Sequence, residues 1–141
     1  MEIIVVLVII GILAALSVPT YTTMVIQGAA KASQNNLITI YNAQKNYYFN
    51  NGTYCTSANG ICNSLASINT TLSLNISDNN FTYTCANTGG FQCTATNISN
   101  TNLILTVTGG LPNNPTPIVL PGGSGTLNPS CVSNNNAYCP S

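Results

Sequence analysis

The strongest constraint on this chain is an uninterrupted apolar run close to its first residue. Residues 3–16 read IIVVLVIIGILAAL, without one polar side chain. About 20 apolar residues span a bilayer as a helix, and a helix that is apolar on every face suits a membrane or the centre of a helix bundle. A secretory signal peptide would place a basic residue before such a core, whereas Glu2 precedes it here. The run therefore predicts a membrane-embedded or bundle-forming stem.

Three residues in or beside this run are candidates for function. A carboxylate at the head of a membrane segment is costly, which makes Glu2 a functional candidate, although the helix dipole also favours an acidic residue in a first turn. Pro19 follows the run and Gly11 lies inside it. Proline costs a helix ~3 kcal/mol and glycine ~1 kcal/mol relative to alanine. The helix between these two residues is expected to open easily, with a simple kink as the alternative.

From residue 20 to about residue 50 the pattern becomes amphipathic. Residues three or four positions apart lie on one face of a helix. Six residues follow this spacing: Leu37, Ile40, Tyr41, Gln44, Tyr47 and Tyr48. Asn50, Asn51 and Gly52 then form a stop signal. We therefore expect a long helix over residues 1–51, divided into a hydrophobic stem (1–23) and an amphipathic half (24–51). A disulfide-bearing, β-rich head should follow over residues 52–141.

The head is expected to contain three or four antiparallel strands packed on the amphipathic half of the helix, in an α+β fold. Residues 53–79 read as an irregular loop with apolar anchors. Alternating segments predict strands at 81–85, 92–96 and 102–108, with a turn at 88–90. Residues 118–120 are expected to form a short fourth strand.

Six cysteines lie in the head and are even in number. Zinc sites need spacings such as C-x₂-C, often with histidine, and neither feature is present. Disulfides in an oxidising compartment are the better interpretation. Six cysteines allow fifteen pairings, of which the sequence-local one is Cys55–Cys62, Cys85–Cys93 and Cys131–Cys139.

Charge is almost missing from the chain, which has no histidine and four charged residues: Glu2, Lys31, Lys45 and Asp78. No acid–base pair or nucleophile–histidine set can be built, so we do not expect an enzyme or a cofactor. Two lysines without arginine make no basic patch for nucleic acid. Calcium prefers several carboxylate or carbonyl oxygens, and Asp78 is the only acid in the head, so no metal site is expected. A net charge near zero favours association.

Two further features have ordinary explanations. Five N-x-S/T sequons occur, at Asn51, Asn69, Asn75, Asn80 and Asn97. Chance gives a similar number in a chain so rich in asparagine, serine and threonine, so glycosylation is an expectation only for an exposed fibre. Aromatic residues gather at Tyr41, Tyr47, Tyr48, Phe49 and Tyr54. Helical spacing beside a sheet predicts that this cluster is core packing.

Residues 2–21, EIIVVLVIIGILAALSVPTY, and residues 36–55, NLITIYNAQKNYYFNNGTYC, resemble type IV pilins and the related pseudopilins. The resemblance implies a major structural subunit of an extracellular type IV pilus. In that family cell adhesion, twitching, DNA uptake and aggregation use similar subunits, so the sequence does not choose among these roles. The alternatives are a pseudopilin of a type II secretion system and a minor or tip adhesin pilin. The implied partners are many copies of the same chain, the inner membrane before assembly, a prepilin peptidase and the pilus assembly machinery.

The resemblance also assigns roles to residues of the stem. Glu2 would pair with the N-terminal amine of a neighbouring subunit, and the segment from Gly11 to Pro19 would melt on assembly. The stem would pack in the fibre through Ile3, Ile4, Val5, Val6, Leu7, Val8, Ile9, Ile10, Ile12, Leu13 and Leu16. In that family the mature chain begins about three positions upstream of Met1, after a short basic leader. We therefore expect about three further residues before Met1, and the family's methylated amine is assigned to no residue of this sequence.

Overall fold

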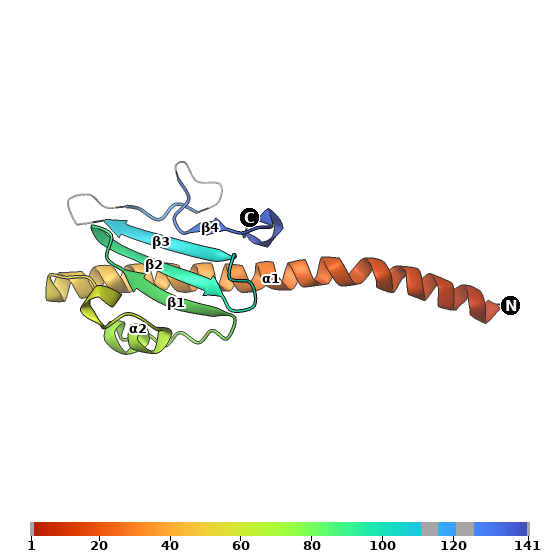
Figure 1. Ribbon diagram of the computed structural model, residues 1–141, viewed down its shortest axis with the longest axis horizontal. Helices are drawn as coiled ribbons and strands as arrows, with labels where there is room; N and C mark the ends of the chain where they lie inside the picture. Colours follow the sequence, from red (N-terminus) through yellow and green to blue (C-terminus); the bar gives the residue numbers. More distant parts are fainter. Residues whose placement is uncertain (1, 111–115, 121–125, 141) are drawn as a thin grey trace.

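The computed structural model describes residues 2–110, 116–120 and 126–140, with the side chains of residues 2 and 16–19 left outside the description. One long helix, α1 (Glu2–Asn51), runs beneath a four-stranded antiparallel sheet. The sheet covers only the C-terminal half of α1, and the N-terminal half extends away from the head (Figure 1). The expected α+β class, with a helical stem and a β-rich head, is confirmed.

Helix α1 is continuous from Glu2 to Asn51. Its backbone stays helical between Gly11 and Pro19, so the opening of this segment on assembly remains a prediction. The helix ends where Gly52 adopts φ 70° and donates its N–H to the carbonyl of Tyr48 at 2.8 Å. This left-handed cap suits glycine, because a side chain is strained at positive φ.

The sheet is a meander in the order β1-β2-β3-β4. Its strands are β1 (Phe81–Ala86), β2 (Gly90–Asn97), β3 (Ile104–Gly110) and β4 (Ser130–Val132). In β1 the side chains of Phe81, Tyr83 and Cys85 are buried against the helix, and their neighbours Thr82 and Thr84 face outwards. This period of two is the one expected for an antiparallel sheet with one solvated face.

The expected fourth strand was placed wrongly. Residues 118–120 contribute only an isolated bridge, between Val119 and Asn128. The fourth strand is β4, in which Cys131 pairs with Leu105 of β3. A strand this short has no apolar alternation to reveal it, and only the tertiary pairing identifies it. The third strand also begins and ends two residues later than expected, because Gly110 pairs with Gly90.

Residues 53–79 are not the irregular loop that we expected. They contain the 3₁₀ turn η1 (Ser57–Asn59) and the helix α2 (Leu65–Leu72). Ser64 caps α2, because its Oγ accepts from the N–H of Ser67 at 3.3 Å while the Ser67 hydroxyl accepts from the N–H of Ser64 at 3.1 Å. This reciprocal capping box stabilises the first turn.

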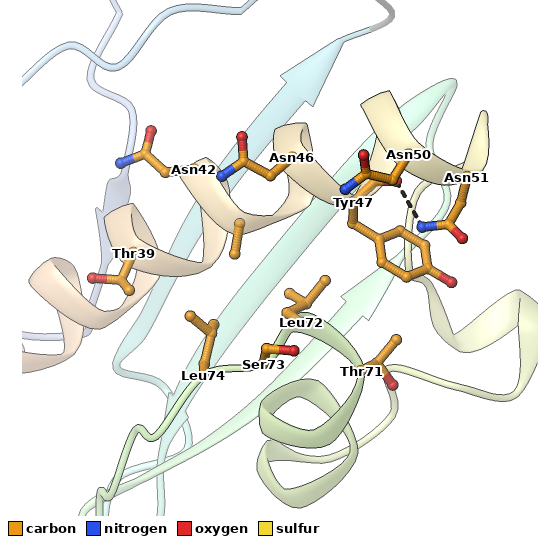
Figure 2. Close-up of a pocket in the computed structure, with 11 residues that line it drawn as sticks. Thr39, Asn42, Asn46, Tyr47, Asn50, Asn51, Thr71, Leu72, Ser73 and Leu74 are labelled. Atoms are coloured by element: carbon orange, nitrogen blue, oxygen red, sulfur yellow. Dashed lines mark hydrogen bonds between the residues drawn. The ribbon is translucent and has the colours of Figure 1, made fainter.

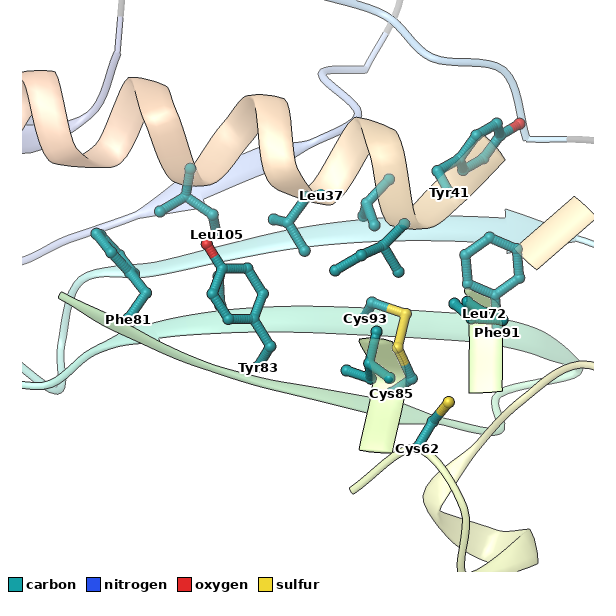
Figure 3. Packing of buried hydrophobic residues seen from close by; sticks show 14 of the residues in the cluster. Leu37, Tyr41, Cys62, Leu72, Phe81, Tyr83, Cys85, Phe91, Cys93 and Leu105 are labelled. Atoms are coloured by element: carbon teal, nitrogen blue, oxygen red, sulfur yellow. A yellow bond between two sulfur atoms is a disulfide. The ribbon is translucent and has the colours of Figure 1, made fainter. Parts of the chain in front are cut away.

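The core lies between α1 and the inner face of the sheet, with α2 at one side (Figure 3). Leu37 and Tyr41 of the helix face Phe91 and Leu105 of the sheet. The ring of Phe91 also passes over Gly109, where a Cβ atom would lie 2.2 Å from the ring. Glycine at this position therefore makes room for the aromatic layer.

Three disulfides join the cysteines that are neighbours in sequence: Cys55–Cys62, Cys85–Cys93 and Cys131–Cys139. The second bridge connects directly opposed residues of the β1–β2 hairpin. The third connects Cys131 of β4 to Cys139, the residue that directly follows the 3₁₀ turn η2 (Asn136–Tyr138). Each bridge closes a short loop of the head, so the polar segments between strands are anchored locally.

The aromatic cluster is only partly core. Tyr41 and Tyr54 are buried, and Tyr47 and Tyr48 pack partly buried against the core. Phe49 is 93% exposed, so its expected burial is wrong. One residue along a helix rotates a side chain by about 100°, which moves Phe49 off the face that Tyr41 and Tyr48 share.

Candidate functional site

The stem of α1 presents a continuous apolar surface. Side-chain exposure is 51–77% for Ile3, Ile4, Val5, Val6, Leu7, Val8, Ile9, Ile10, Ile12 and Leu13. The surface continues along the helix to Tyr21, Met24 and Val25, which are also exposed. The side chain of Leu16 lies outside the described part. In length and composition this helix is able to cross a membrane.

An exposed apolar surface of this kind is stabilised when lipid or other protein buries it. Burial of one Val, Leu or Ile side chain is worth about 1.5–3 kcal/mol, and the exposed set on the stem is far larger than the single apolar residues normal on a monomer. Within the described part of the chain these apolar residues of the stem are more than half exposed. Lipid, or the stems of other subunits, can supply the missing contacts.

Glu2 is the first residue of α1. Its backbone therefore lies at the positive end of the helix dipole, where a carboxylate is favoured. Its side chain is outside the described part, so the partner of its carboxylate remains a prediction.

Gly11 has open space around the position of a Cβ atom.

Asp78, the acid of the head, is engaged by donors of its own chain. Its Oδ1 accepts from the backbone N–H groups of Asn80 at 2.8 Å and Phe81 at 3.2 Å. Its Oδ2 accepts from the Tyr83 hydroxyl at 2.6 Å and from the Asn36 amide at 3.4 Å. The carboxylate thereby connects α1 to the start of β1, and this set of contacts indicates a structural role.

The Tyr83 hydroxyl lies inside this polar cluster, 2.9 Å from the Ser33 hydroxyl. Burial raises the pKa of Tyr83 above the usual value for tyrosine, and its hydrogen bond to Asp78 raises the pKa further. Among the described residues no group of three His, Cys, Asp or Glu side chains could bind a metal ion.

A cleft of about 610 Å³, the helix cleft, lies between α1 and α2 (Figure 2). Asn42, Asn46 and Asn50 line it at intervals of four residues, so they follow one face of α1. Tyr47 and Leu72 form apolar parts of its wall. All three asparagines are exposed, so water can satisfy their amides.

A smaller cleft of about 320 Å³, the end cleft, lies where α1 ends. Its lining comes from the last turn of α1, the segment up to η1 and the turn between β1 and β2: Tyr48, Gly52, Thr53, Tyr54, Thr56, Asn59, Asn87, Gly89 and Gly90. Thr56 is only 1% exposed, and its hydroxyl has no hydrogen-bond partner among the described residues. A buried hydroxyl without a partner is unusual in a folded protein.

The structure separates the five sequons by what their side chains bind. Asn69 bonds to both backbone groups of Ile76, and Asn97 is buried and accepts from two backbone N–H groups. Asn51 donates to the carbonyl of Tyr47 at 2.9 Å. Asn75 and Asn80 are exposed and make no side-chain hydrogen bond to the described residues. Glycosylation, where it occurs, is therefore expected at Asn75 or Asn80.

The two lysines do not form a cationic surface. Lys31 and Lys45 are both exposed on α1 and lie fourteen positions apart, which is about 21 Å along a helix axis. The Lys45 ammonium lies 4.6 Å from the centre of the Tyr41 ring. The two lysines are therefore too far apart to form one cationic patch.

The end cleft could not be recognised in the sequence. Its residues come from three segments with no shared motif, and a threonine without a partner cannot be recognised before the chain is folded. The capping box at Ser64 and Ser67, by contrast, was a readable signal for α2. Apolar residues at Leu65, Ile68 and Leu72 gave the matching helical spacing.

A sequence profile of the family described as "Type IV minor pilin ComP, DNA uptake sequence receptor" matches residues 19–103. The match covers more than half of the 141 residues. It includes the amphipathic half of α1 and the strands β1 and β2. No curated protein and no solved structure matches the chain significantly.

Proposed function

Because the chain belongs to this family of type IV minor pilins, we propose that it is a minor subunit of a type IV pilus that joins the filament through its apolar stem. The main supporting observation is the exposed apolar surface of residues 3–13, which needs lipid before assembly and other stems afterwards. The head would then lie outside the bundle of stems. Under this proposal the protein would lie in the inner membrane first and on the cell surface after assembly.

The resemblance of the N-terminal motif favoured a major subunit, and the family match supports the minor-pilin alternative instead. Abundance distinguishes these two roles. We expect quantitative mass spectrometry of purified filaments to find this chain at a small fraction of the main subunit. Filaments made chiefly of this chain would contradict the proposal. Loss of the gene product should leave filaments present.

Glu2 is the residue that we propose for subunit register. An unpaired carboxylate in a low-dielectric bundle is very costly, so pairing with the N-terminal amine of a neighbour would favour one axial position. Glu2→Ala should leave the head folded and its disulfides formed, and should sharply reduce the amount of chain in filaments. The matched control is Ile3→Val, which changes one methylene beside it. Incorporation of Glu2→Ala into filaments at the wild-type level would refute the role of Glu2 in subunit register.

The expected melting of the stem between Gly11 and Pro19 also belongs to assembly. In the single chain this segment is helical. If it opened in a filament, the backbone groups that lose their helical hydrogen bonds would need other partners or water. Gly11→Ala should make opening harder by about 1 kcal/mol. An image reconstruction of the filament that retains a continuous helix here would contradict melting.

The family description also names a DNA uptake sequence receptor, which makes DNA reception a second candidate function. Affinity for DNA depends largely on lysine and arginine that neutralise phosphates. This chain has two lysines and no arginine, and the two are far apart. We therefore expect fluorescence anisotropy with a labelled duplex to give affinities no tighter than the non-specific range of about 10⁻⁴–10⁻⁶ M. Nanomolar, sequence-dependent binding would establish that the chain is a DNA receptor.

A further inference from the structure

We propose that residues 133–140, at the C-terminal end of the head, form a redox-sensitive clasp on α1 that a dithiol opens. The clasp follows β4 and contains the turn η2. It lies over α1 at the end of the head from which the stem emerges (Figure 1). The Cys131–Cys139 disulfide closes it by joining its last turn to β4.

The clasp rests on α1 at the junction between stem and head. Gln27 of α1 donates its Nε2 to the carbonyl of Ala137 in η2 at 2.5 Å. Tyr138 packs partly buried against the core. A groove of about 270 Å³ is lined by Pro140 from the clasp and, from α1, by Met24, Gln27, Gly28 and Lys31. The clasp therefore contacts the part of α1 that follows the apolar stem.

The backbone hydrogen bonds within the clasp are local. The N–H of Ala137 donates to Oδ1 of Asn135 at 3.0 Å, and the N–H of Cys139 donates to the carbonyl of Asn136 at 3.2 Å. Residues 134–137 are all exposed. Segments with exposed backbone and few buried apolar contacts open at the lowest free energies. The disulfide is therefore the main restraint that returns the end of the chain to the sheet.

The chain before the clasp is held much more firmly. Asn128 is buried, and its Oδ1 accepts the Thr108 N–H at 3.0 Å. Its Nδ2 donates to the carbonyls of Thr108 at 2.9 Å and Pro117 at 3.0 Å. In β4, Cys131 pairs with Leu105 of β3. Loss of the disulfide should therefore release residues 133–140 and leave strands β1–β3 intact.

A dithiol can open the clasp by thiol–disulfide exchange, because Cys131 and Cys139 are both partly exposed. One thiolate of the dithiol attacks a sulfur of the bridge, which forms a mixed disulfide and releases the other cysteine as a thiolate. The second thiol of the reductant then displaces the remaining cysteine. The dithiol leaves as a disulfide, and the protein has gained two electrons and two protons. Closing the clasp again requires a disulfide oxidant.

Opening would change the surface of the junction. Tyr21, Met24 and Val25 are exposed apolar residues at this level of α1. Release of the clasp would add Tyr138 and the uncovered part of α1 to that surface. The redox state would thereby control whether the subunit enters a filament, a consequence that rests on the proposed function, whereas the opening itself does not.

The test is ¹⁵N relaxation NMR of the full chain in dodecylphosphocholine micelles, before and after limiting dithiothreitol. Alkylation and peptide mapping identify which bridge has been reduced. After reduction of Cys131–Cys139 we expect the backbone order parameters of residues 133–140 to fall from about 0.85 to below about 0.6. The order parameters of β1–β3 should not change.

The decisive variant carries Cys131→Ser together with Cys139→Ser. It should show the open clasp without reductant, and limiting dithiothreitol should have no further effect on residues 133–140. The matched control is Gln27→Ala, which removes the hydrogen bond to Ala137 but keeps the disulfide, so its clasp should stay closed. If the double variant fails to fold, the partly reduced wild type supplies the same comparison.

Two NMR results would overturn the proposal. Retained order at residues 133–140 after reduction of Cys131–Cys139 would show that noncovalent contacts hold this segment. Loss of order throughout β1–β3 would show that the bridge stabilises the whole head rather than a clasp.

Recovery of the chain in sheared filaments tests the consequence for assembly. We expect the double variant to be lost from filaments and Gln27→Ala to be recovered at the wild-type level. Wild-type recovery of a double variant whose clasp is open would refute the redox control of assembly. Absence of the wild type itself from filaments would instead refute the proposed function, and the NMR result on the clasp would still stand.

Discussion

Gln44 binds the backbone of Cys55 through both groups of its side-chain amide. Its Oε1 accepts the Cys55 N–H at 2.9 Å, and its Nε2 donates to the Cys55 carbonyl at 2.6 Å. Gln44 is fully buried, and its Nε2 also lies 3.9 Å from the sulfur of Cys93. One glutamine on the helix therefore holds the chain at the point where the head begins and contacts the disulfide of the hairpin.

The Gln44–Cys55 pair predicts a large loss of stability on truncation. Gln44→Ala would leave the N–H and carbonyl of Cys55 buried without partners and would open a cavity. We expect the free energy of unfolding of the full chain in detergent to fall by about 2–4 kcal/mol. Asn46→Ala, on the exposed face two residues later, should change it by less than about 0.5 kcal/mol. Equal effects of the two substitutions would refute the stabilising role of the Gln44–Cys55 pair.

The disulfides should differ in their sensitivity to reduction. Cys131 and Cys139 are partly exposed, whereas the cysteines of the other two bridges are buried. Thiol–disulfide exchange requires access of the attacking thiolate. Native-state treatment with limiting dithiothreitol, followed by alkylation and peptide mapping, should label Cys131 and Cys139 first. Earlier labelling of the Cys55–Cys62 bridge would contradict the burial of that bridge.

The buried Tyr83 predicts a loss of stability at alkaline pH. Its pKa is raised in the folded state, chiefly by burial and then by its hydrogen bond to Asp78. The folded chain therefore retains this proton while the unfolded chain releases it above about pH 10. Stability from this group is complete below that pH and is lost as the pH rises further.

The measurement is denaturant unfolding between pH 8 and about pH 11, with short incubation to preserve the disulfides. Tyr83→Phe should be less stable at pH 8 by about 1.5–3 kcal/mol, because Asp78 loses a donor. It should also lose less stability than the wild type as the pH rises. Parallel pH dependence in the two proteins would show that Tyr83 is not the responsible group.

Phe49 is expected to matter for assembly rather than folding. It is an exposed aromatic residue near the end of α1, in a chain that we propose to pack beside other pilins. Phe49→Ala should change the free energy of unfolding by less than about 0.5 kcal/mol. It should reduce the recovery of the chain in sheared filaments, since burying such a ring is worth about 1.5–3 kcal/mol. Tyr41→Ala is the contrasting control, because it should destabilise the head itself.

Local patterns in the sequence were sufficient for much of the architecture. The apolar run of residues 3–16 predicted the stem, and the amphipathic spacing around Leu37 and Tyr41 predicted which part of the helix meets the sheet. The N-terminal motif was enough to recognise a pilin, which the family match confirms. The choice between major and minor subunit was not encoded in that motif, since both share the same stem.

The sequence alone determined the features that arise within one segment: a helix apolar on all faces, alternating strands, and a head almost without charge. Tertiary structure decided the features that need segments distant in sequence. The Thr56 hydroxyl is buried without a hydrogen-bond partner among the described residues. Asp78 accepts hydrogen bonds from Tyr83 and Asn36, which come from two different elements. Phe49 is exposed because the sheet packs on another face of α1. Burial and hydrogen-bond satisfaction are properties of the packed chain, whereas periodicity is a property of its local order.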